Sequence, residues 1–301
     1  MIKKVLFVSV LALSGCSSME RLVDAPEKQT STQAGAYELE LYKRSVHLFD
    51  PVSVDDIASS ERLQPRLENL FILVDDGDDS ELYRGVPKQV YVYEIFRRFN
   101  LSMPHLNLRG GAYRLSEHDD ELWVGPYSSR EVQHKIDLNK PLTSLGTKNL
   151  AQGIEKITEL AVTARGRTGL VIFTDWQNIT AQEVEAVARF RQRGEALAGF
   201  NVMPQIGSWD GSENPFCVFA VGVGNAMSRS LFDQADVCGF SEAADKVAQP
   251  RDMAYFVRKI LFTTPLDSDG DGIYDYQDQC PDTPAGRIIN RLGCLRFEAE
   301  E

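Results

Sequence analysis

Three short runs of consecutive apolar residues mark the chain, at residues 70–74 (LFILV), 169–174 (GLVIFT) and 217–223 (CVFAVGV). A continuous apolar run of this length is typical of a strand that is buried on both faces, as strands are in a parallel sheet. Two weaker runs, at residues 106–115 and 122–124, predict shorter strands.

Between and after these runs, apolar residues recur at the spacing of helices that bury one face. The four helical stripes are Val92, Ile95, Phe96 and Phe99 after Pro87; Leu150, Ile154, Ile157 and Ala161; Val184, Val187 and Ala188 after the Thr180–Glu183 capping box; and Met253, Phe256, Val257 and Ile260 within residues 252–262. Strands that alternate with such helices predict an α/β fold, doubly wound, with a mainly parallel sheet and helices on both faces. We place this domain at residues 67–264.

The segment before this domain lacks its regular pattern. Residues 17–40 are rich in Ser, Thr, Gln, Glu and Ala and hold few large apolar side chains, which predicts a tether. Residues 41–65 are ambiguous, and they contain side chains that could pack on the domain as an irregular lead-in: Tyr42, Val46, Leu48, Phe49 and Val52.

Residues 1–15 have the features of a signal peptide. Lys3 and Lys4 precede an apolar run at residues 5–13, which is too short to span a bilayer as a mature helix. The run ends in the small residues Ser14 and Gly15, directly before a cysteine.

This sequence resembles the bacterial lipobox. The resemblance implies that cleavage leaves Cys16 as the first residue of the mature chain, with acyl chains on its thiol. It also implies sorting to the outer membrane, because Ser17 rather than Asp follows the cysteine. Residues 16–66 would then be a lipidated N-terminus, a tether and a lead-in. An ordinary secretory signal with a chance cysteine is the alternative.

The charge of the chain limits its partners. Its formal net charge is −12, and loss of Lys3 and Lys4 with the signal peptide makes the mature chain more acidic. An acidic surface repels nucleic acid and anionic headgroups and suits divalent cations. The 43% content of hydrophobic residues is sufficient for a packed core.

The cysteines indicate disulfide bonds. Four of the five remain when Cys16 is set aside, namely Cys217, Cys238, Cys280 and Cys294, and an even number in an exported chain favours disulfides. Of the three connectivities, we prefer Cys217–Cys238 with Cys280–Cys294, because each bond then stays within one module. Four free buried thiols are the alternative.

Polar residues follow the predicted strands where a doubly wound sheet binds ligands. Asp75-Asp76-Gly77-Asp78-Asp79-Ser80 follows the first strand, Asp175-Trp176 follows the second, and Gly146-Thr147 precedes the helix that starts near Leu150. With the order of the strands and helices, this arrangement resembles the von Willebrand factor type A domain. The resemblance implies a divalent ion, usually Mg²⁺, which a carboxylate of a protein partner completes.

Carried over residue by residue, the resemblance assigns Asp75, Asp79, Thr147 and Asp175 to this magnesium site. The match has departures, because Gly77 and Asp79 stand where the family has Ser and Trp176 replaces its Gly. A register shifted by one residue, Asp76-x-Asp78-x-Ser80, recovers one Ser. A solvated acidic turn that caps the next helix is the alternative.

The last module, residues 265–301, contains a regular array of oxygen ligands. In residues 267–278 (DSDGDGIYDYQD), the ligand positions of an EF-hand-like loop hold Asp267, Asp269, Asp271, the Ile273 carbonyl, Asp275 and Asp278. Gly272 occupies the sharp turn at the sixth position. This spacing predicts a Ca²⁺ site; an acidic linker without metal is the alternative.

The segment that follows has Cys280-Pro281 and Gly293-Cys294, and no flanking helices are evident. The module thus resembles a thrombospondin type 3 repeat, as found in linkers of outer-membrane protein A-like proteins. In many relatives the linker leads into a peptidoglycan-binding domain. Only seven residues follow Cys294 here, so we expect no peptidoglycan-binding domain.

These features predict a non-enzymatic lipoprotein of the outer membrane, facing the periplasm or the cell surface, whose type A domain binds a protein partner. A structural spacer of the cell envelope is the first alternative. An envelope enzyme is the second, but the four histidines (His47, His105, His118 and His134) lack metal-ligand spacing. No nucleophile elbow or phosphate-cradling loop is present.

Overall fold

The computed structural model describes residues 48–75, 82–83, 86–115, 123–135, 149–161, 163, 166–175, 180–198, 216–224, 238–275 and 277–296. The signal peptide, Cys16, the tether, Tyr42 and Val46 lie outside these residues. Within the described part of the chain, no helix is long and apolar enough to cross a membrane.

A six-stranded sheet with the order β6-β5-β2-β7-β8-β9 forms the centre of the domain. Its strands are β2 (Asn69–Val74), β5 (Arg109–Arg114), β6 (Trp123–Pro126), β7 (Thr168–Thr174), β8 (Phe216–Gly222) and β9 (Gly239–Ala243). All neighbours pair in parallel except β6, which pairs antiparallel with β5. Counted in chain order, the strands lie 3-2-1-4-5-6, which is a doubly wound order with its switch point between the first and fourth strands. The predicted α/β class and mainly parallel sheet are confirmed.

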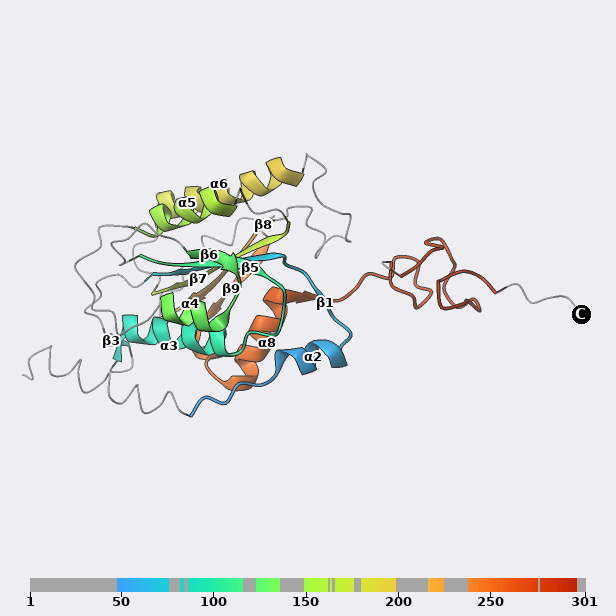
Figure 1. The fold of residues 1–301 in the computed structure, drawn as a ribbon, viewed down its shortest axis with the longest axis horizontal. Coiled ribbons are helices and arrows are strands. Elements are labelled where there is room, and N and C mark those ends of the chain that lie inside the picture. The colour runs from blue at the N-terminus through green and yellow to red at the C-terminus, as the bar shows by residue number, and fades with distance from the viewer. Residues whose placement is uncertain are drawn as a thin grey trace, which may run out of the picture.

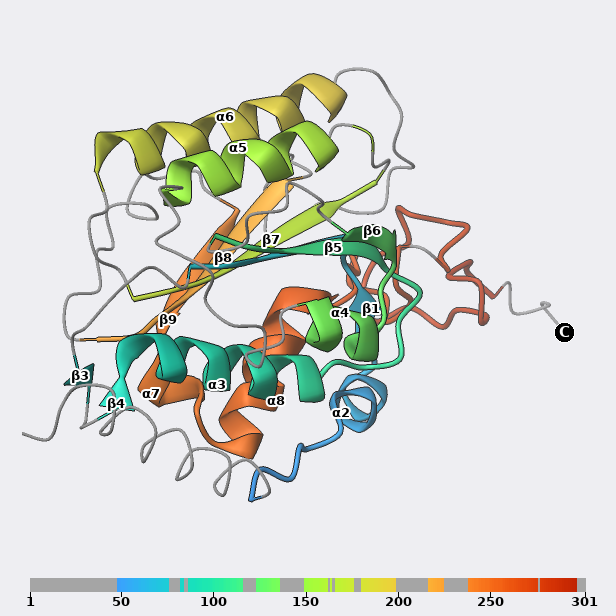
Figure 2. The same ribbon diagram turned by 60° about the vertical axis from the view of Figure 1, so that its left-hand side comes forward.

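Helices cover both faces of this sheet (Figures 1 and 2). One face carries α5 (Leu150–Ala161) and α6 (Ala181–Ala198), and the other carries α3 (Lys88–Leu101), α4 (Ser129–Lys135), α7 (Ala244–Val247) and α8 (Pro250–Leu261), with α2 (Val54–Ser60) packed on α8. The three inner strands of the sequence prediction are buried at every position. In β2, Leu70 and Ile72 face the cluster under α3 and α8, whereas Phe71 and Leu73 face the cluster under α5 and α6. Full burial of such a side chain contributes roughly 1.5–3 kcal/mol, so both helix layers are held by the same strands.

Short strand pairs complete the domain. At its base β1 (Gln64–Pro65) pairs with β10 (Phe262–Thr263), directly after α8, and β3 (Leu82–Tyr83) pairs with β4 (Val86–Pro87) before α3. The lead-in was predicted only in part. Phe49 is buried as expected, but Leu48 is 83% exposed and Val52 is 38% exposed, so these two side chains do not pack on the domain.

The structure pairs Cys217 with Cys238 and Cys280 with Cys294, which is the local pairing preferred from the sequence. The first bond joins the start of β8 to the residue before β9, and these two strands are parallel neighbours. The second bond lies in the C-terminal module, where the described backbone forms turns and a single bridge between Ile289 and Leu295.

Candidate metal site and the carboxyl edge of the sheet

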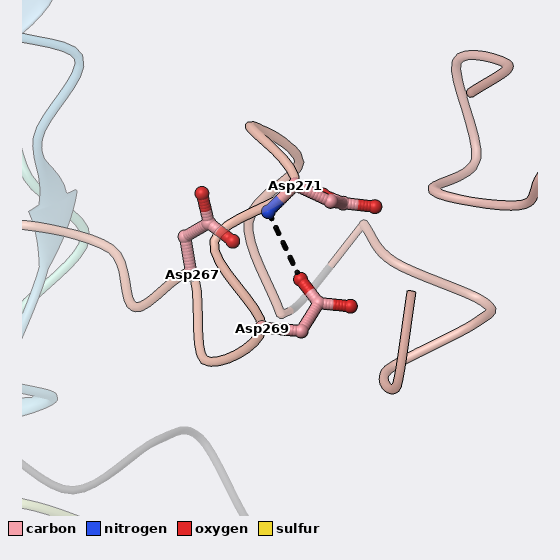
Figure 3. Close-up of side chains that lie close together, drawn as sticks. All are labelled: Asp267, Asp269 and Asp271. Carbon is pink, nitrogen blue, oxygen red and sulfur yellow. Dashed lines mark hydrogen bonds between the residues drawn. The ribbon is translucent and has the colours of Figure 1, made fainter. Parts of the chain in front are cut away.

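The C-terminal loop brings three aspartates together. One carboxylate oxygen each of Asp267, Asp269 and Asp271 lies within 4.8 Å of the others, and all three side chains are half-buried (Figure 3). Among the described residues, no other group of three acidic, histidine or cysteine side chains is close enough together to share one ion. We call these residues the aspartate triad.

The loop folds around its own carboxylates. Asp267 accepts hydrogen bonds from the N–H groups of Gly270 and Gly272, both at 2.9 Å. Oδ1 of Asp269 accepts the Asp271 N–H at 3.2 Å, the bond drawn in Figure 3, and Oδ1 of Asp271 accepts the Ile273 N–H at 2.7 Å. These short-range bonds need Asp at alternate positions, which is why the D-x-D-x-D spacing folds into a tight turn.

One carboxylate oxygen of the triad differs from the others in its hydrogen bonding. Oδ2 of Asp271 is buried and has no hydrogen-bond partner among the described residues. A buried carboxylate oxygen without a partner is costly, and a cation is one of the few groups that satisfies it. The donor set is all oxygen, which suits a hard divalent cation such as Ca²⁺ or Mg²⁺. The triad therefore fits a divalent cation.

The other three predicted ligands lie outside the triad. Asp275 is bonded to Ser268, whose hydroxyl at 2.6 Å and N–H at 2.7 Å hold the pKa of the Asp275 carboxyl below its ordinary value. Oδ1 of Asp278 accepts the Cys280 N–H at 2.8 Å. Asp278 is nevertheless close to the triad, because a Cβ atom on Gly293 would lie 1.8 Å from Asp278 Oδ1 and 3.3 Å from Asp271 Oδ2. The third of these residues, Ile273, makes the hydrogen bond from its N–H to Asp271 Oδ1 that is described above.

Thr283, whose role was not predicted from the sequence, ties the loop to the rest of the module. It is 5% exposed, and its N–H donates to Asp269 Oδ2 at 2.7 Å. Its hydroxyl contacts the Gly293 carbonyl oxygen at 2.7 Å. The Cys280–Cys294 bond closes the same segment, so the triad is held against a cross-linked turn. The threonine after Cys-Pro-Asp is the sequence signal for this contact.

The second region of interest is the carboxyl edge of the sheet, where β2 and β7 end at the switch point. Asp75 follows β2 and Asp175 follows β7. The Asp75 N–H donates to Phe173 O at 2.7 Å, and Asp75 Oδ2 accepts the Thr174 hydroxyl at 2.7 Å. The structure therefore places two of the four predicted magnesium ligands at one edge. Asp79 and Thr147 lie outside the described residues, as do Asp76, Asp78 and Ser80 of the shifted register.

Two features of this edge were not predicted from the sequence. Lys88, the first residue of α3, is only 9% exposed, and its Nζ would lie 4.0 Å from a Cβ atom on Gly224, the second residue after β8. Asp175 O would lie 3.7 Å from the same Cβ position. Farther along the edge, Asp245 of α7 accepts hydrogen bonds from the hydroxyls of Tyr83 and Tyr91, at 2.5 and 3.0 Å. A lysine at the start of an amphipathic helix is ordinarily solvated, so its spacing carries no signal for burial.

The surroundings of Lys88 do not suit the magnesium ion that the family resemblance implies. A divalent cation at the ends of β2 and β7 would have to share this edge with a buried ammonium group, and the two positive charges repel each other. The described residues at this edge, Asp75, Asp175 and Lys88, therefore fit Mg²⁺ poorly, in contrast to the triad.

Comparison with known proteins does not identify the family. No family model matches the chain, and no curated protein sequence matches it. Among solved structures, proximal thread matrix protein 1 from the mussel byssus is similar, with 11% identity and a TM-score of 0.39 over 66% of this chain. The chain spans about half the length of that protein, 48%.

A second solved structure is the conserved hypothetical protein BatB from Bacteroides thetaiotaomicron. It has 12% identity and a TM-score of 0.38, over 64% of this chain and 98% of its own. Both TM-scores are low, so neither likeness assigns a function to this chain.

Proposed function

We propose that this chain is an exported, lipid-anchored protein whose C-terminal loop binds Ca²⁺ and whose α/β domain binds a protein partner. The aspartate triad supports the calcium site most directly, because Asp271 Oδ2 is buried without a hydrogen-bond partner among the described residues. The EF-hand-like spacing of the six predicted ligands and the resemblance to a thrombospondin type 3 repeat favour Ca²⁺ over Mg²⁺.

Charge repulsion explains why the loop would need an ion. Two unit charges 4.8 Å apart repel by roughly 1 kcal/mol in water and by about 3.5 kcal/mol at an effective dielectric constant of 20. The triad oxygens lie within this distance of one another and the residues are half-buried, so the repulsion of each pair is of this order. Bound calcium would supply the opposite charge. Asp267, Asp269 and Asp271 would hold it, while Thr283 and the Cys280–Cys294 bond keep Asp269 and the following turn in place.

Export and anchoring rest on the N-terminal sequence and on the disulfides. Stable disulfide bonds are typical of oxidising compartments outside the cytosol, and the chain has two of them. The lipobox-like sequence before Cys16 provides the membrane anchor, and Ser17 favours the outer membrane. Two or more acyl chains hold a protein stably on a membrane, since each buried methylene adds about 0.8 kcal/mol.

We assign partner binding to the carboxyl edge of the sheet, because ligands of doubly wound folds bind outside the carboxyl ends of the strands at the switch point. In this proposal the domain is a non-enzymatic binding module. The resemblance to von Willebrand factor type A domains supports a protein as the ligand.

A spacer role for the C-terminal module is the second candidate. Figure 1 shows the module extending away from the domain beyond β1 and β10, and its turns are cross-linked by a disulfide. A module of this kind that is stiffened by calcium would hold the α/β domain at a fixed distance from whatever follows or binds the module.

The calcium site is tested by calorimetry on the full chain. Asp269→Asn with Asp271→Asn removes two triad charges, so the double variant should bind Ca²⁺ at least tenfold more weakly. Asp282→Asn is the matched control, because Asp282 lies in the same module, is exposed and lies outside the triad. The same calcium isotherm for the double variant and the control would remove the site.

Partner binding is tested separately by crosslinking in cells from a photoreactive residue at position 242, on the edge strand β9. A protein captured from this position, and not from position 159, which is exposed on α5, supports the carboxyl edge as the docking site. Equal capture from both positions contradicts it.

A further inference from the structure

A lysine at the carboxyl edge carries one further inference. The helix α3 runs back from the end of β2 toward the start of β5, so its first residue, Lys88, lies at the carboxyl edge. We propose that the Lys88 ammonium group provides the positive charge at the ends of β2, β7 and β8, and that this edge works without a divalent metal ion.

Geometry puts the ammonium group over the strand ends. Lys88 Cε and Nζ would lie 3.7 and 4.0 Å from a Cβ atom on Gly224, and the Asp175 carbonyl oxygen lies 3.7 Å from the same point. Val223 continues β8 toward the neighbouring strand, since its N–H donates to Thr174 O at 2.9 Å, and Gly224 follows it directly. The long side chain therefore reaches from α3 across to the end of β7, where Asp175 begins the next turn.

Burial makes the charge of Lys88 consequential. Lys88 is 9% exposed, and a buried ammonium group persists only where negative charge and hydrogen-bond acceptors compensate for its lost hydration. The topology brings the carboxylates of Asp75 and Asp175 to this same edge. They relieve the desolvation of the lysine, and the lysine relieves their mutual repulsion, which is the task that a divalent ion would otherwise perform.

The bonds of Asp75 agree with this arrangement. Its Oδ2 accepts the Thr174 hydroxyl at 2.7 Å, and Thr174 is fully buried. One oxygen of Asp75 is thus held by a neutral donor from the neighbouring strand. A partner that docks at this edge would meet an ammonium group, so its own acidic side chain would bind to Lys88 directly, without a bridging metal. This consequence rests on the proposed partner site, whereas the absence of a metal requirement does not.

Manganese binding by the full chain tests the inference, followed by the loss of the free Mn²⁺ signal in electron paramagnetic resonance. All variants carry Asp269→Asn and Asp271→Asn so that the C-terminal loop does not contribute. The parent should bind no Mn²⁺ at the carboxyl edge up to millimolar concentration. Lys88→Met removes the charge and shortens the unbranched side chain by only one atom, so it should gain at least tenfold in Mn²⁺ affinity.

Further variants separate the alternatives. Asp175→Asn added to Lys88→Met should abolish the gained binding, and Lys88→Arg, which keeps the charge, should not bind Mn²⁺. Lys246→Met is the matched control, because Lys246 is exposed on α7 and its loss should leave Mn²⁺ binding unchanged. A folded Lys88→Met protein without gained Mn²⁺ binding would overturn the inference.

Even if Lys88→Met does not fold, the parent protein shows whether the carboxyl edge binds a metal ion. Mn²⁺ binding by the parent that disappears with Asp75→Asn or Asp175→Asn would show that the edge is a metal site, and would overturn the inference. No partner takes part in these titrations. Their failure therefore leaves the proposed partner site standing with a bridging metal, while failure of the crosslinking from position 242 leaves the role of Lys88 intact.

Discussion

Gly293 provides a sharp test of the proposed calcium site, because it lies against the aspartate loop without being a predicted ligand. Its φ angle is +79°, and a Cβ atom at this position would lie 1.8 Å from Asp278 Oδ1. Gly286 is the matched control in the same module. Its φ angle is +78°, and a Cβ atom there would meet nothing within 4 Å. Alanine at either position pays the same backbone strain, roughly 1–2 kcal/mol.

The two substitutions differ in what the new methyl group displaces. In Gly293→Ala the Asp278 carboxylate must move by more than 1 Å, since Cβ contacts under 3.0 Å essentially do not occur. The Asp278 carboxylate then loses the Cys280 N–H, a bond of 2.8 Å. A hydrogen bond to a charged group contributes about 1.5–3 kcal/mol, and Asp278 is half-buried, which favours the lower end. We expect the module to lose about 1.5–2 kcal/mol more in Gly293→Ala than in Gly286→Ala.

Calcium binding should separate the two variants further. Displacement of Asp278 removes one predicted ligand from beside Asp271, so Gly293→Ala should weaken Ca²⁺ binding at least tenfold, which corresponds to 1.4 kcal/mol. Gly286→Ala should keep the affinity of the parent. Calorimetric titration of both variants with Ca²⁺ measures the difference. Equal affinities in the two variants would show that Asp278 and the triad do not form one site.

Three further predictions concern the disulfide, the anchor and pH. Replacing Cys217 and Cys238 by Ala should lower the free energy of unfolding by about 3 kcal/mol, from the loop entropy of a 21-residue separation, and an unchanged urea midpoint would contradict this. Cys16→Ser should leave the precursor unprocessed and without lipid, as seen by mass spectrometry of the membrane fraction; a mature, lipidated variant would refute the lipobox interpretation. The hydrogen bonds from Ser268 lower the pKa of the Asp275 carboxyl. These bonds should therefore stabilise the metal-free loop at neutral pH and be lost as the pH falls through that lowered pKa. Amide exchange of Ser268 between pH 6 and pH 2 follows it, and a Ser268→Ala variant with the same pH profile would argue against it.

The sheet was predictable because its central strands are buried on both faces. In β2, β7 and β8 every residue is buried, so the strands appear in the sequence as continuous apolar runs. Helix α5 was equally clear, since Leu150, Ile154, Ile157 and Ala161 are all buried and lie on one face. In such elements the local pattern and the tertiary environment agree, which is why they can be predicted from the sequence.

The lead-in shows why other elements could not be predicted. Helix α2 has seven residues and buries only Val54 and Ala58, so the sequence has no apolar stripe that would predict it. Its available signal was the N-cap, where Ser53 Oγ accepts the Asp56 N–H at 3.2 Å. Phe49 packs in the core cluster with the guanidinium of Arg98 over its ring at 5.2 Å, whereas its neighbour Leu48 is exposed. That contact joins residues far apart in the chain, and hydrophobicity alone does not distinguish the two side chains.

The candidate sites differ in the same way. The aspartate triad comes from five consecutive residues, so its spacing in the sequence already fixes its geometry in space. The carboxyl edge is assembled from the ends of separate strands and from the start of α3. Sequence order and topology place Asp75 and Asp175 there, but the burial of Lys88 depends on how α3 packs over β2 and β7. A long side chain with a charged tip can be solvated or buried at the same position, so its role became visible only in the structure.

The two candidate sites lie at opposite edges of the sheet, and this separation bears on whether they act together. Helix α8 is followed directly by β10, which pairs with β1 just before β2 begins, so the C-terminal module leaves the domain at the amino edge. Asp75, Asp175 and Lys88 lie at the carboxyl edge, one strand length away. Seven residues of β7 span about 20 Å. Charges at this separation are largely screened at physiological ionic strength, where the Debye length is about 8 Å. Calcium bound by the triad should therefore not change the electrostatics at the carboxyl edge, and a chelator should release a partner only if that partner contacts the C-terminal module itself.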